Sequence, residues 1–193
     1  MMDKETRHSL YVDICEKLLD QYEWKNKAYG NNAHITYCKF GDASYAVRIF
    51  DKLNRMKTLM NNRTIDAHDE AILDTIGDGI TYCVMCVADK AAQETLKEKF
   101  TEESDLNETF VRNYFANIMR TPMVIDSTLA VVGNKRNNPG GMLDTAFETM
   151  DMKNGAAKIA AVLLDMYAEE YELQNPDEEE INEEDTGDED LDW

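Results

Sequence analysis

Hydrophobic residues recur every three or four positions along much of the chain, which is the spacing of one face of an α-helix. The first such run covers residues 6–27, with apolar positions at Leu10, Tyr11, Ile14, Leu18 and Tyr22. Gly and Asn tolerate the left-handed backbone that ends many helices, so YGNN at residues 29–32 predicts the end of this helix. A short irregular segment through Gly41 and Asp42 is expected to follow.

A second run predicts a helix from Ser44, as its N-cap, to about Asn61. Its inward-facing residues are expected to be Val47, Phe50, Leu53, Met56 and Met60. The segment NNRTIDAHD reads as a connection in which Asp66 or Asp69 caps a third helix, predicted over residues 69–89. The packed stripe of this third helix consists of Leu73, Ile76, Ile80, Val84 and Val87.

The pattern stays helical beyond residue 90, over residues 91–100 and 106–119. Pro122 disfavours helical geometry in the residue before it and ends the second of these runs. Residues 123–133, MVIDSTLAVVG, are rich in β-branched side chains and predict a short strand pair, with a buried helix as the alternative. Residues 142–173 predict one long helix or two shorter ones separated at Asn154 and Gly155. The bundle-facing residues expected in these segments are Phe110, Tyr114, Phe115, Ile118, Ile159, Val162, Leu163, Met166 and Tyr167.

These patterns predict an all-α protein built as a helical bundle. A chain of 193 residues is long enough for one hydrophobic core with appendages. Three regions are expected: a helical domain at residues 1–90, an additional helical region at 91–175 packed on it, and a disordered acidic tail at 176–193.

The formal net charge of −19 is concentrated at one end of the chain. Eleven carboxylates lie between Asp177 and Trp193, where there is no Lys or Arg, so the remainder carries a net charge of −8. Phosphate contacts with nucleic acid require clustered basic residues, and the 20 Lys and Arg residues are scattered along the chain. Direct nucleic-acid binding is therefore not expected.

A cytoplasmic protein is predicted from two further absences. The start, MMDKETRHSL, lacks the apolar run of a secretory signal, and no stretch approaches the roughly 18 to 20 apolar residues that span a bilayer. Cys83 and Cys86 form a C-x-x-C, which is typical of redox or zinc sites, but they lie in an apolar helical pattern. Buried, reduced thiols are the favoured interpretation.

Carboxylates at helical spacing form the candidate chemical site. Glu70, Asp74 and Asp78 step along one side of the third helix, and Asp51 lies on the second. Mg²⁺ prefers such oxygen ligands and can bridge phosphate oxygens and activate water, with Mn²⁺ as a substitute. Glu16, from the acidic stripe of the first helix, is a further candidate metal ligand. The alternative is that these carboxylates belong to solvated helix faces, with Asp51 and Arg55 forming an i, i+4 pair.

Three segments together resemble a phage-associated family, the nucleotide modification associated domain 1, which is related to MazG-like all-α nucleoside triphosphate pyrophosphatases. They are KNKAYGNN, AVRIFDKLNRMKTL and HDEAILDTIGDGITYC, which begin at residues 25, 46 and 68. The match covers about 80 of the 193 residues and keeps the order of the family's motifs. MazG-like enzymes carry a glutamate at the position where this chain has Thr75.

The resemblance implies a MazG-like helical bundle, often oligomeric, that uses Mg²⁺ to hydrolyse a nucleoside triphosphate to a monophosphate and pyrophosphate. The setting would be phage nucleotide or modified-base metabolism in the host cytoplasm. Carried over by position, the catalytic metal ligands would be Asp51, Glu70, Asp74 and Asp78. The substrate contacts would be Lys25, Tyr29, Arg48, Lys52 and Arg55.

Three other interpretations remain open. His34, His68, Asp69 and Asp126 follow the order of HD phosphohydrolases, although His68 and Asp69 equally suit a helix cap. The loop NKRNNPGG, at residues 134–141, could approach a phosphate or be a plain surface turn. The tail, ending DEDLDW, is similar to tails that recruit replication partners or to an acidic decoy, which defines a non-enzymatic alternative; it could equally serve solubility alone.

Overall fold

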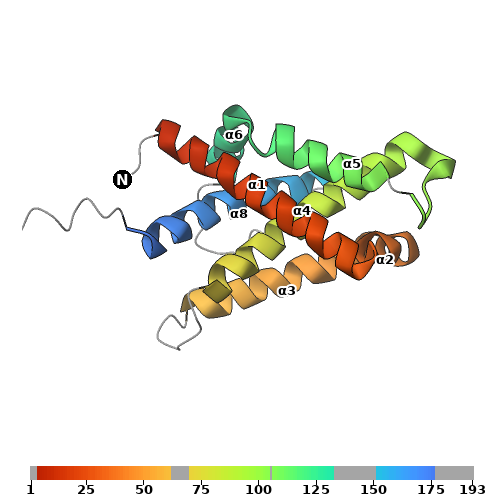
Figure 1. Ribbon diagram of the computed structural model, residues 1–193, viewed down its shortest axis with the longest axis horizontal. Helices are drawn as coiled ribbons and strands as arrows, with labels where there is room; N and C mark the ends of the chain where they lie inside the picture. The colour runs from red at the N-terminus through yellow and green to blue at the C-terminus, as the bar shows by residue number, and fades with distance from the viewer. Residues whose placement is uncertain (1–3, 62–69, 105, 133–150, 177–193) are drawn as a thin grey trace, which may run out of the picture.

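The computed structural model describes residues 4–61, 70–104, 106–132 and 151–176. Every regular element in these ranges is a helix, so the all-α prediction is confirmed (Figure 1). No helix in the described ranges is both long enough and apolar enough to cross a lipid bilayer.

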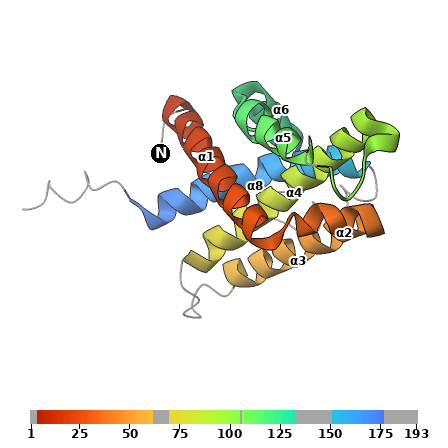
Figure 2. The same cartoon turned by 45° about the vertical axis from the view of Figure 1, so that its right-hand side comes forward.

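Two helices, α4 (Glu70–Leu96) and α8 (Met152–Gln174), form the centre of the molecule. They pack against each other, and α4 also contacts α1, α2, α3 and α5. Figures 1 and 2 show α3 on one side of this pair, with α5 and α6 on the other. The helix α8 is buried almost all round, as expected of an apolar helix at the centre of a core. Its predicted bundle-facing residues are buried: Ile159, Val162, Leu163, Met166 and Tyr167.

The first helix, α1 (Lys4–Tyr29), agrees with its prediction. Tyr11, Ile14, Leu18 and Tyr22 are all buried on one face. The helix ends where predicted, because Gly30 and Asn31 adopt positive φ angles of 65° and 54°.

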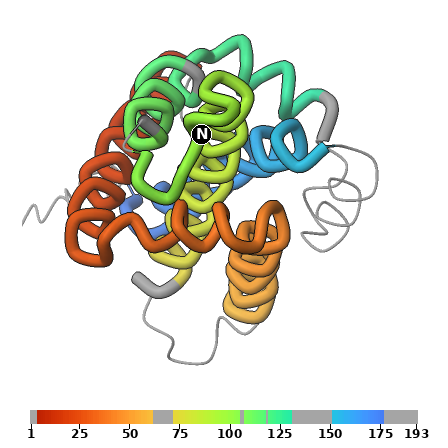
Figure 3. The backbone as a smooth tube through the Cα atoms, turned by 90° about the vertical axis from the view of Figure 1, so that its right-hand side faces the viewer, coloured from red at the N-terminus to blue at the C-terminus, as the bar shows by residue number. Residues whose placement is uncertain are grey.

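The expected irregular segment after this turn is wrong, since residues 32–40 form a helix. In α2 (Asn32–Phe40) the buried residues are Ala33, His34 and Tyr37. Figure 3 shows α2 carrying the chain across α4, from the end of α1 to the start of α3. The helices α2 and α3 are separated at Gly41, whose positive φ of 61° favours glycine.

The third helix, α3 (Asp42–Asn61), begins two residues earlier than predicted. Ser44 lies inside it and donates a hydrogen bond to the Gly41 carbonyl at 2.8 Å, so its predicted N-cap role is wrong. Val47 and Phe50 are 61% and 49% exposed, and the inward positions belong to Tyr45 and Ile49. Apolar side chains surround the first half of this helix, so spacing alone did not identify the buried face.

The helix α4 passes through residue 90, the predicted boundary of the first region, and ends at Leu96 before a short 3₁₀ turn at Lys97–Lys99. The third helix therefore continues seven residues beyond its predicted end at residue 89, through the start of the next predicted helical run. Ile76, Ile80, Val84 and Val87 form its buried stripe as predicted. Both proposed capping residues, Asp66 and Asp69, lie outside the described residues.

The C-terminal half contains α5 (Leu106–Asn113), a π-helical segment at Tyr114–Ile118, and α6 (Pro122–Val132). The predicted strand pair is wrong, because α6 is helical and Pro122 occupies its first position, where proline is tolerated. The helix α8 continues unbroken through Asn154 and Gly155, so the alternative of an interruption at these residues is wrong, whereas residues 142–150 of the predicted helix lie outside the described residues. The loop at residues 134–141 and the acidic tail lie outside the described residues.

Candidate functional site

A pocket of about 300 Å³ lies between α1, α3 and α4. Positions three or four apart place its α1 and α4 residues on one side of each helix. The turn after α1 brings the first residues of α2 to the same place. The lining residues are Tyr22, Lys25, Asn26, Tyr29, Asn32, Ala33, Arg48, Asp78, Thr81, Tyr82 and Met85.

Asp78 joins the three helices of the pocket through two lysines. Its Oδ1 accepts a hydrogen bond from Lys25 Nζ of α1 at 2.8 Å, and its Oδ2 accepts one from Lys52 Nζ of α3 at 2.6 Å. Burial acts to raise the pKa of Asp78, but the hydrogen bonds from both lysines outweigh it and lower the pKa. Burial acts to lower the pKa of Lys25, and the contact with Asp78 raises it overall. The three groups form a charged cluster with one excess positive charge.

Arg48 and three tyrosines also line this pocket. The Arg48 guanidinium lies 5.4 Å from the centroid of the Tyr82 ring, within cation–π range. Tyr29 is 70% exposed at the end of α1, whereas Tyr22 is buried. The Tyr22 hydroxyl has no hydrogen-bond partner among the described residues.

These groups suit a ligand that is anionic at one end and planar at the other. Lys25 and Arg48 can donate charge-assisted hydrogen bonds to an anion. The tyrosine rings offer faces for stacking, and Asn26 and Asn32 bring amide groups to the same pocket. A volume of about 300 Å³ lies at the lower end of the range of small-molecule sites.

The structure brings together part of the predicted substrate site. Lys25, Tyr29 and Arg48 line the pocket, and Lys52 reaches it through Asp78. Arg55 is exposed and is absent from the described lining of the pocket.

The predicted metal ligands are more widely separated than the predicted substrate contacts. Asp51 is exposed on α3. Asp74 is exposed one turn before Asp78 and borders a second pocket, of about 220 Å³, that includes Tyr167. Glu70 begins α4, and its side chain lies outside the described part of the chain. Glu16 pairs with Arg120 at 3.2 Å, away from the pocket lining.

The described side chains do not fit a metal site. Among them, no group of three or more His, Cys, Asp or Glu residues is placed to hold a metal ion. Both carboxylate oxygens of Asp78 accept hydrogen bonds from lysine ammonium groups. The positive charges of these lysines would repel a metal cation at the same carboxylate. Because the Glu70 side chain is outside the described residues, the complete predicted ligand set stays a prediction.

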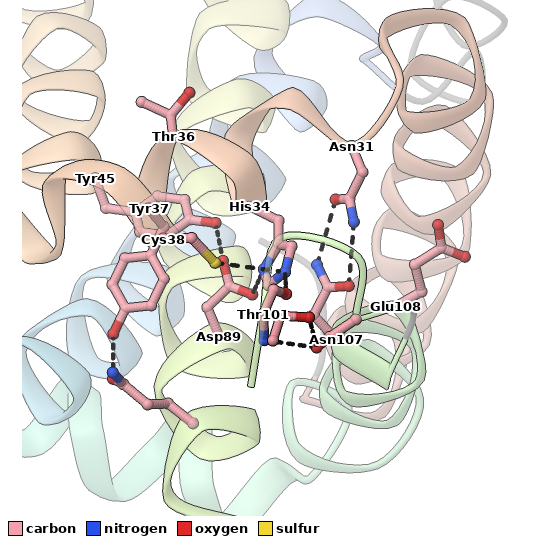
Figure 4. A network of polar contacts seen from close by, with 12 residues as sticks. Asn31, His34, Thr36, Tyr37, Cys38, Tyr45, Asp89, Thr101, Asn107 and Glu108 are labelled. Carbon is pink, nitrogen blue, oxygen red and sulfur yellow. Dashed lines mark hydrogen bonds and ion pairs between the residues drawn. The ribbon is translucent and has the colours of Figure 1, made fainter. Parts of the chain in front are cut away.

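A buried polar network lies next to this site, between α2, α3 and α4 (Figure 4). His34 Nδ1 is 2.8 Å from Asp89 Oδ1, and His34 Nε2 is 2.9 Å from the Thr101 carbonyl oxygen. Tyr45 donates to the second Asp89 oxygen at 2.5 Å. A carbonyl only accepts, and the carboxylate accepts from both sides, so both ring nitrogens of His34 donate and the ring is positively charged. Burial opposes this charge, yet the bond to Asp89 raises the pKa of His34.

Cys38, His34 and Asp89 resemble a nucleophile, base and orienting carboxylate, but the geometry is unsuited to catalysis. Cys38 Sγ lies 3.7 Å from His34 Nε2, which already donates to Thr101. Burial also raises the pKa of the Cys38 thiol. A charged, fully bonded imidazole cannot accept a proton, so this network is structural.

The contacts of His34 bear on the HD alternative. The described partners of His34 are Asp89 and Thr101, while Asp126 pairs with Lys4 at 2.6 Å on the surface. His68 and Asp69 lie outside the described residues.

Cys83 and Cys86 are free, buried thiols, as predicted, and burial raises the pKa of Cys86 to about 12.

Several pocket residues were not identified from the sequence. Tyr22 was assigned only to the core, and Asn26, Thr81, Tyr82 and Met85 were not assigned. A signal was present, because residues 22, 26 and 29 and residues 78, 82 and 85 follow helical spacing on two helices. It was uninformative until the packing of α1 against α4 was known.

The fold and pocket define the class of the molecule as an all-α protein with a cationic, tyrosine-lined pocket. Comparison of the chain with protein-family models, curated proteins and solved structures gave no match.

Proposed function

We propose that the chain binds a nucleoside phosphate in the pocket between α1, α3 and α4. The observation that carries this proposal is the convergence of cationic and aromatic side chains on one pocket of about 300 Å³. Lys25 and Arg48 contact the phosphate groups, and the exposed ring of Tyr29 stacks on the base. These are the roles that the family resemblance implies for the same residues.

Hydrolysis to a monophosphate and pyrophosphate is proposed from the sequence resemblance. Mg²⁺ would supply charge neutralisation at the phosphates and an activated water. Its predicted ligands are Asp51, Glu70, Asp74 and Asp78, whose described side chains do not form a metal site. A homo-oligomer and a role in phage nucleotide metabolism are proposed on the same basis.

Binding is tested by calorimetric titration with ribo- and deoxyribonucleoside mono- and triphosphates, in the presence and absence of Mg²⁺. Arg48→Met should weaken the best ligand about tenfold, because a hydrogen bond to a charged group contributes roughly 1.5 to 3 kcal/mol. Arg55→Met is the matched control, since Arg55 lies on the same helix two turns away and is exposed. Its affinity should stay within about twofold of the wild type, which is about 0.4 kcal/mol.

Two results would contradict the proposal. One is that no nucleotide binds, and the other is that Arg55→Met weakens binding as much as Arg48→Met. Chromatography of the products, with pyrophosphate resolved from phosphate, tests the hydrolysis separately.

A further inference from the structure

The charge cluster at Asp78 raises a question that nucleotide binding alone leaves open. The carboxylate of Asp78 already binds two lysines, Lys25 of the pocket lining at 2.8 Å and Lys52 at 2.6 Å. All three side chains are partly buried, with 39%, 21% and 22% exposure for Lys25, Lys52 and Asp78. Solvent therefore screens this cluster less than it screens a surface ion pair.

We propose that the carboxylate of Asp78 occupies the position of a ligand phosphate, and that a phosphate or diphosphate group replaces it between Lys25 and Lys52. Asp78 is then a positioning residue for the two lysines, and this role replaces the metal-ligand role that the family resemblance implies for it. The inference rests on the proposed function, since it assigns the anion-binding end of the same pocket.

The chemistry of the exchange follows from the charges. Lys25 and Lys52 come from α1 and α3, and two ammonium groups held this close repel each other unless an anion lies between them. A carboxylate supplies one negative charge and two acceptor oxygens. A phosphate group supplies more negative charge and a third oxygen, so it can hold the same two lysines and also reach a further donor. Arg48 is that donor, because it lines the same pocket.

The exchange has a cost that sets the affinity. Once a phosphate lies between the lysines, the displaced carboxylate of Asp78 is left beside it, and like charges in proximity disfavour binding. Removing the charge of Asp78 should therefore strengthen anion binding. A metal ligand would behave in the opposite way, since its removal weakens binding of the metal and of any metal-bound phosphate.

The experiment is a calorimetric titration of inorganic pyrophosphate into the full chain with EDTA present. The wild type should bind without a divalent cation, and Asp78→Asn should bind about tenfold more tightly, a change of 1.4 kcal/mol. Asp20→Asn is the matched control, because Asp20 is an exposed carboxylate on α1, five positions before Lys25, and is outside the described lining of the pocket. Its affinity should change less than about twofold. Binding of Mn²⁺ alone, followed by electron paramagnetic resonance, should be the same in Asp78→Asn and the wild type.

The proposal is overturned if Asp78→Asn leaves pyrophosphate affinity unchanged or weakens it, or if this variant loses Mn²⁺ binding. A second measurement on the wild type covers the case in which the variant does not fold. Carbon-detected NMR should show the side-chain carboxyl carbon of Asp78 shifting on addition of pyrophosphate while that of exposed Asp51 does not, and equal shifts or none would overturn the exchange. If pyrophosphate behaves as expected but no nucleoside phosphate binds, the proposed function fails and the exchange stands.

Discussion

His34 shows how a single charged residue can be held inside an all-helical core. Its side chain is completely buried, and both ring nitrogens face acceptors, one on α4 and one on the chain after it. Removing one partner of a buried ion pair leaves the other charge buried without a partner, which lowers the free energy of unfolding by about 3 to 5 kcal/mol. The network thus fixes α2 against α4 at the cost of making stability depend on one protonation state.

The pH dependence of unfolding follows from the direction of the His34 pKa, which is raised above the ordinary value of 6.5. A raised pKa in the folded state gives stability that is complete below the unfolded value and is lost as the pH rises through the folded value. The free energy of unfolding of the wild type should therefore fall, relative to His34→Gln, as the pH rises from about 6.5. Urea denaturation followed by circular dichroism at a series of pH values measures this. His8→Gln, at a partly exposed histidine, is the control, and a difference between wild type and His34→Gln that stays constant with pH would contradict the assignment.

The candidate site was predictable at residue scale where a motif specified chemistry. Two of the three segments predicted Lys25, Tyr29 and Arg48 as substrate contacts, and these residues line one pocket, while their role in binding stays a prediction. They did not reveal that Asp78 faces two lysines, because Lys25 and Lys52 lie 53 and 26 positions away in sequence. Only the packing of α1 and α3 on α4 determines that contact.

At the scale of elements, the turn between α2 and α3 depends on a backbone conformation that few residues adopt. Gly41 has a φ of 61°, and its N–H donates to the Tyr37 carbonyl at 2.7 Å. This turn sets the direction of α3 and so the position of Arg48. The helix α2 was not predicted, because it has only nine residues and its flanking Asn and Gly residues are typical of loops.

Gly41→Ala should destabilise the protein by about 1 to 3 kcal/mol, the cost of holding an ordinary residue at a positive φ with a ψ of −150°, a region that is populated almost only by glycine. No atom lies within 4 Å of the added methyl group, so backbone strain alone accounts for the loss. Gly41→Asn is the informative comparison, because the ψ of −150° at Gly41 lies outside the αL region that asparagine tolerates, so asparagine should be destabilised as well. Thermal unfolding of the three proteins should rank glycine first, with the asparagine and alanine variants both clearly lower, and a stabilised alanine variant would exclude the strain argument.

At the scale of the whole molecule, the two ends of the described chain are held together by a buried ionic contact. Arg7 of α1 donates to Asp165 of α8 at 2.7 Å, and the buried hydroxyl of Tyr11 donates to the same carboxylate oxygen at 2.6 Å. The sequence predicted the apolar face of each helix but not this pairing, because Arg7 and Asp165 are 158 positions apart. Periodicity identifies which face of a helix is buried, and does not identify its partner.

Arg7→Met should lower the free energy of unfolding by about 2 kcal/mol, because it removes hydrogen bonds to a charged, buried carboxylate. Lys153→Met removes the surface pair between Lys153 and Glu94 and should cost less than about 1 kcal/mol. Chemical denaturation of both variants at one pH measures the difference. Equal losses would mean that burial of Asp165 does not strengthen the contact between α1 and α8.

The helix α4 uses separate faces for the core and for the pocket, and this separation has an evolutionary consequence. One face of this helix carries Ile76, Ile80 and Val84 in the core, and another presents Asp78 and Tyr82 to the pocket. Most pocket side chains are thus absent from the set that fills the core, so mutations can alter ligand preference while leaving the scaffold nearly intact. Such a helix can diverge quickly on one side while selection for folding preserves the other.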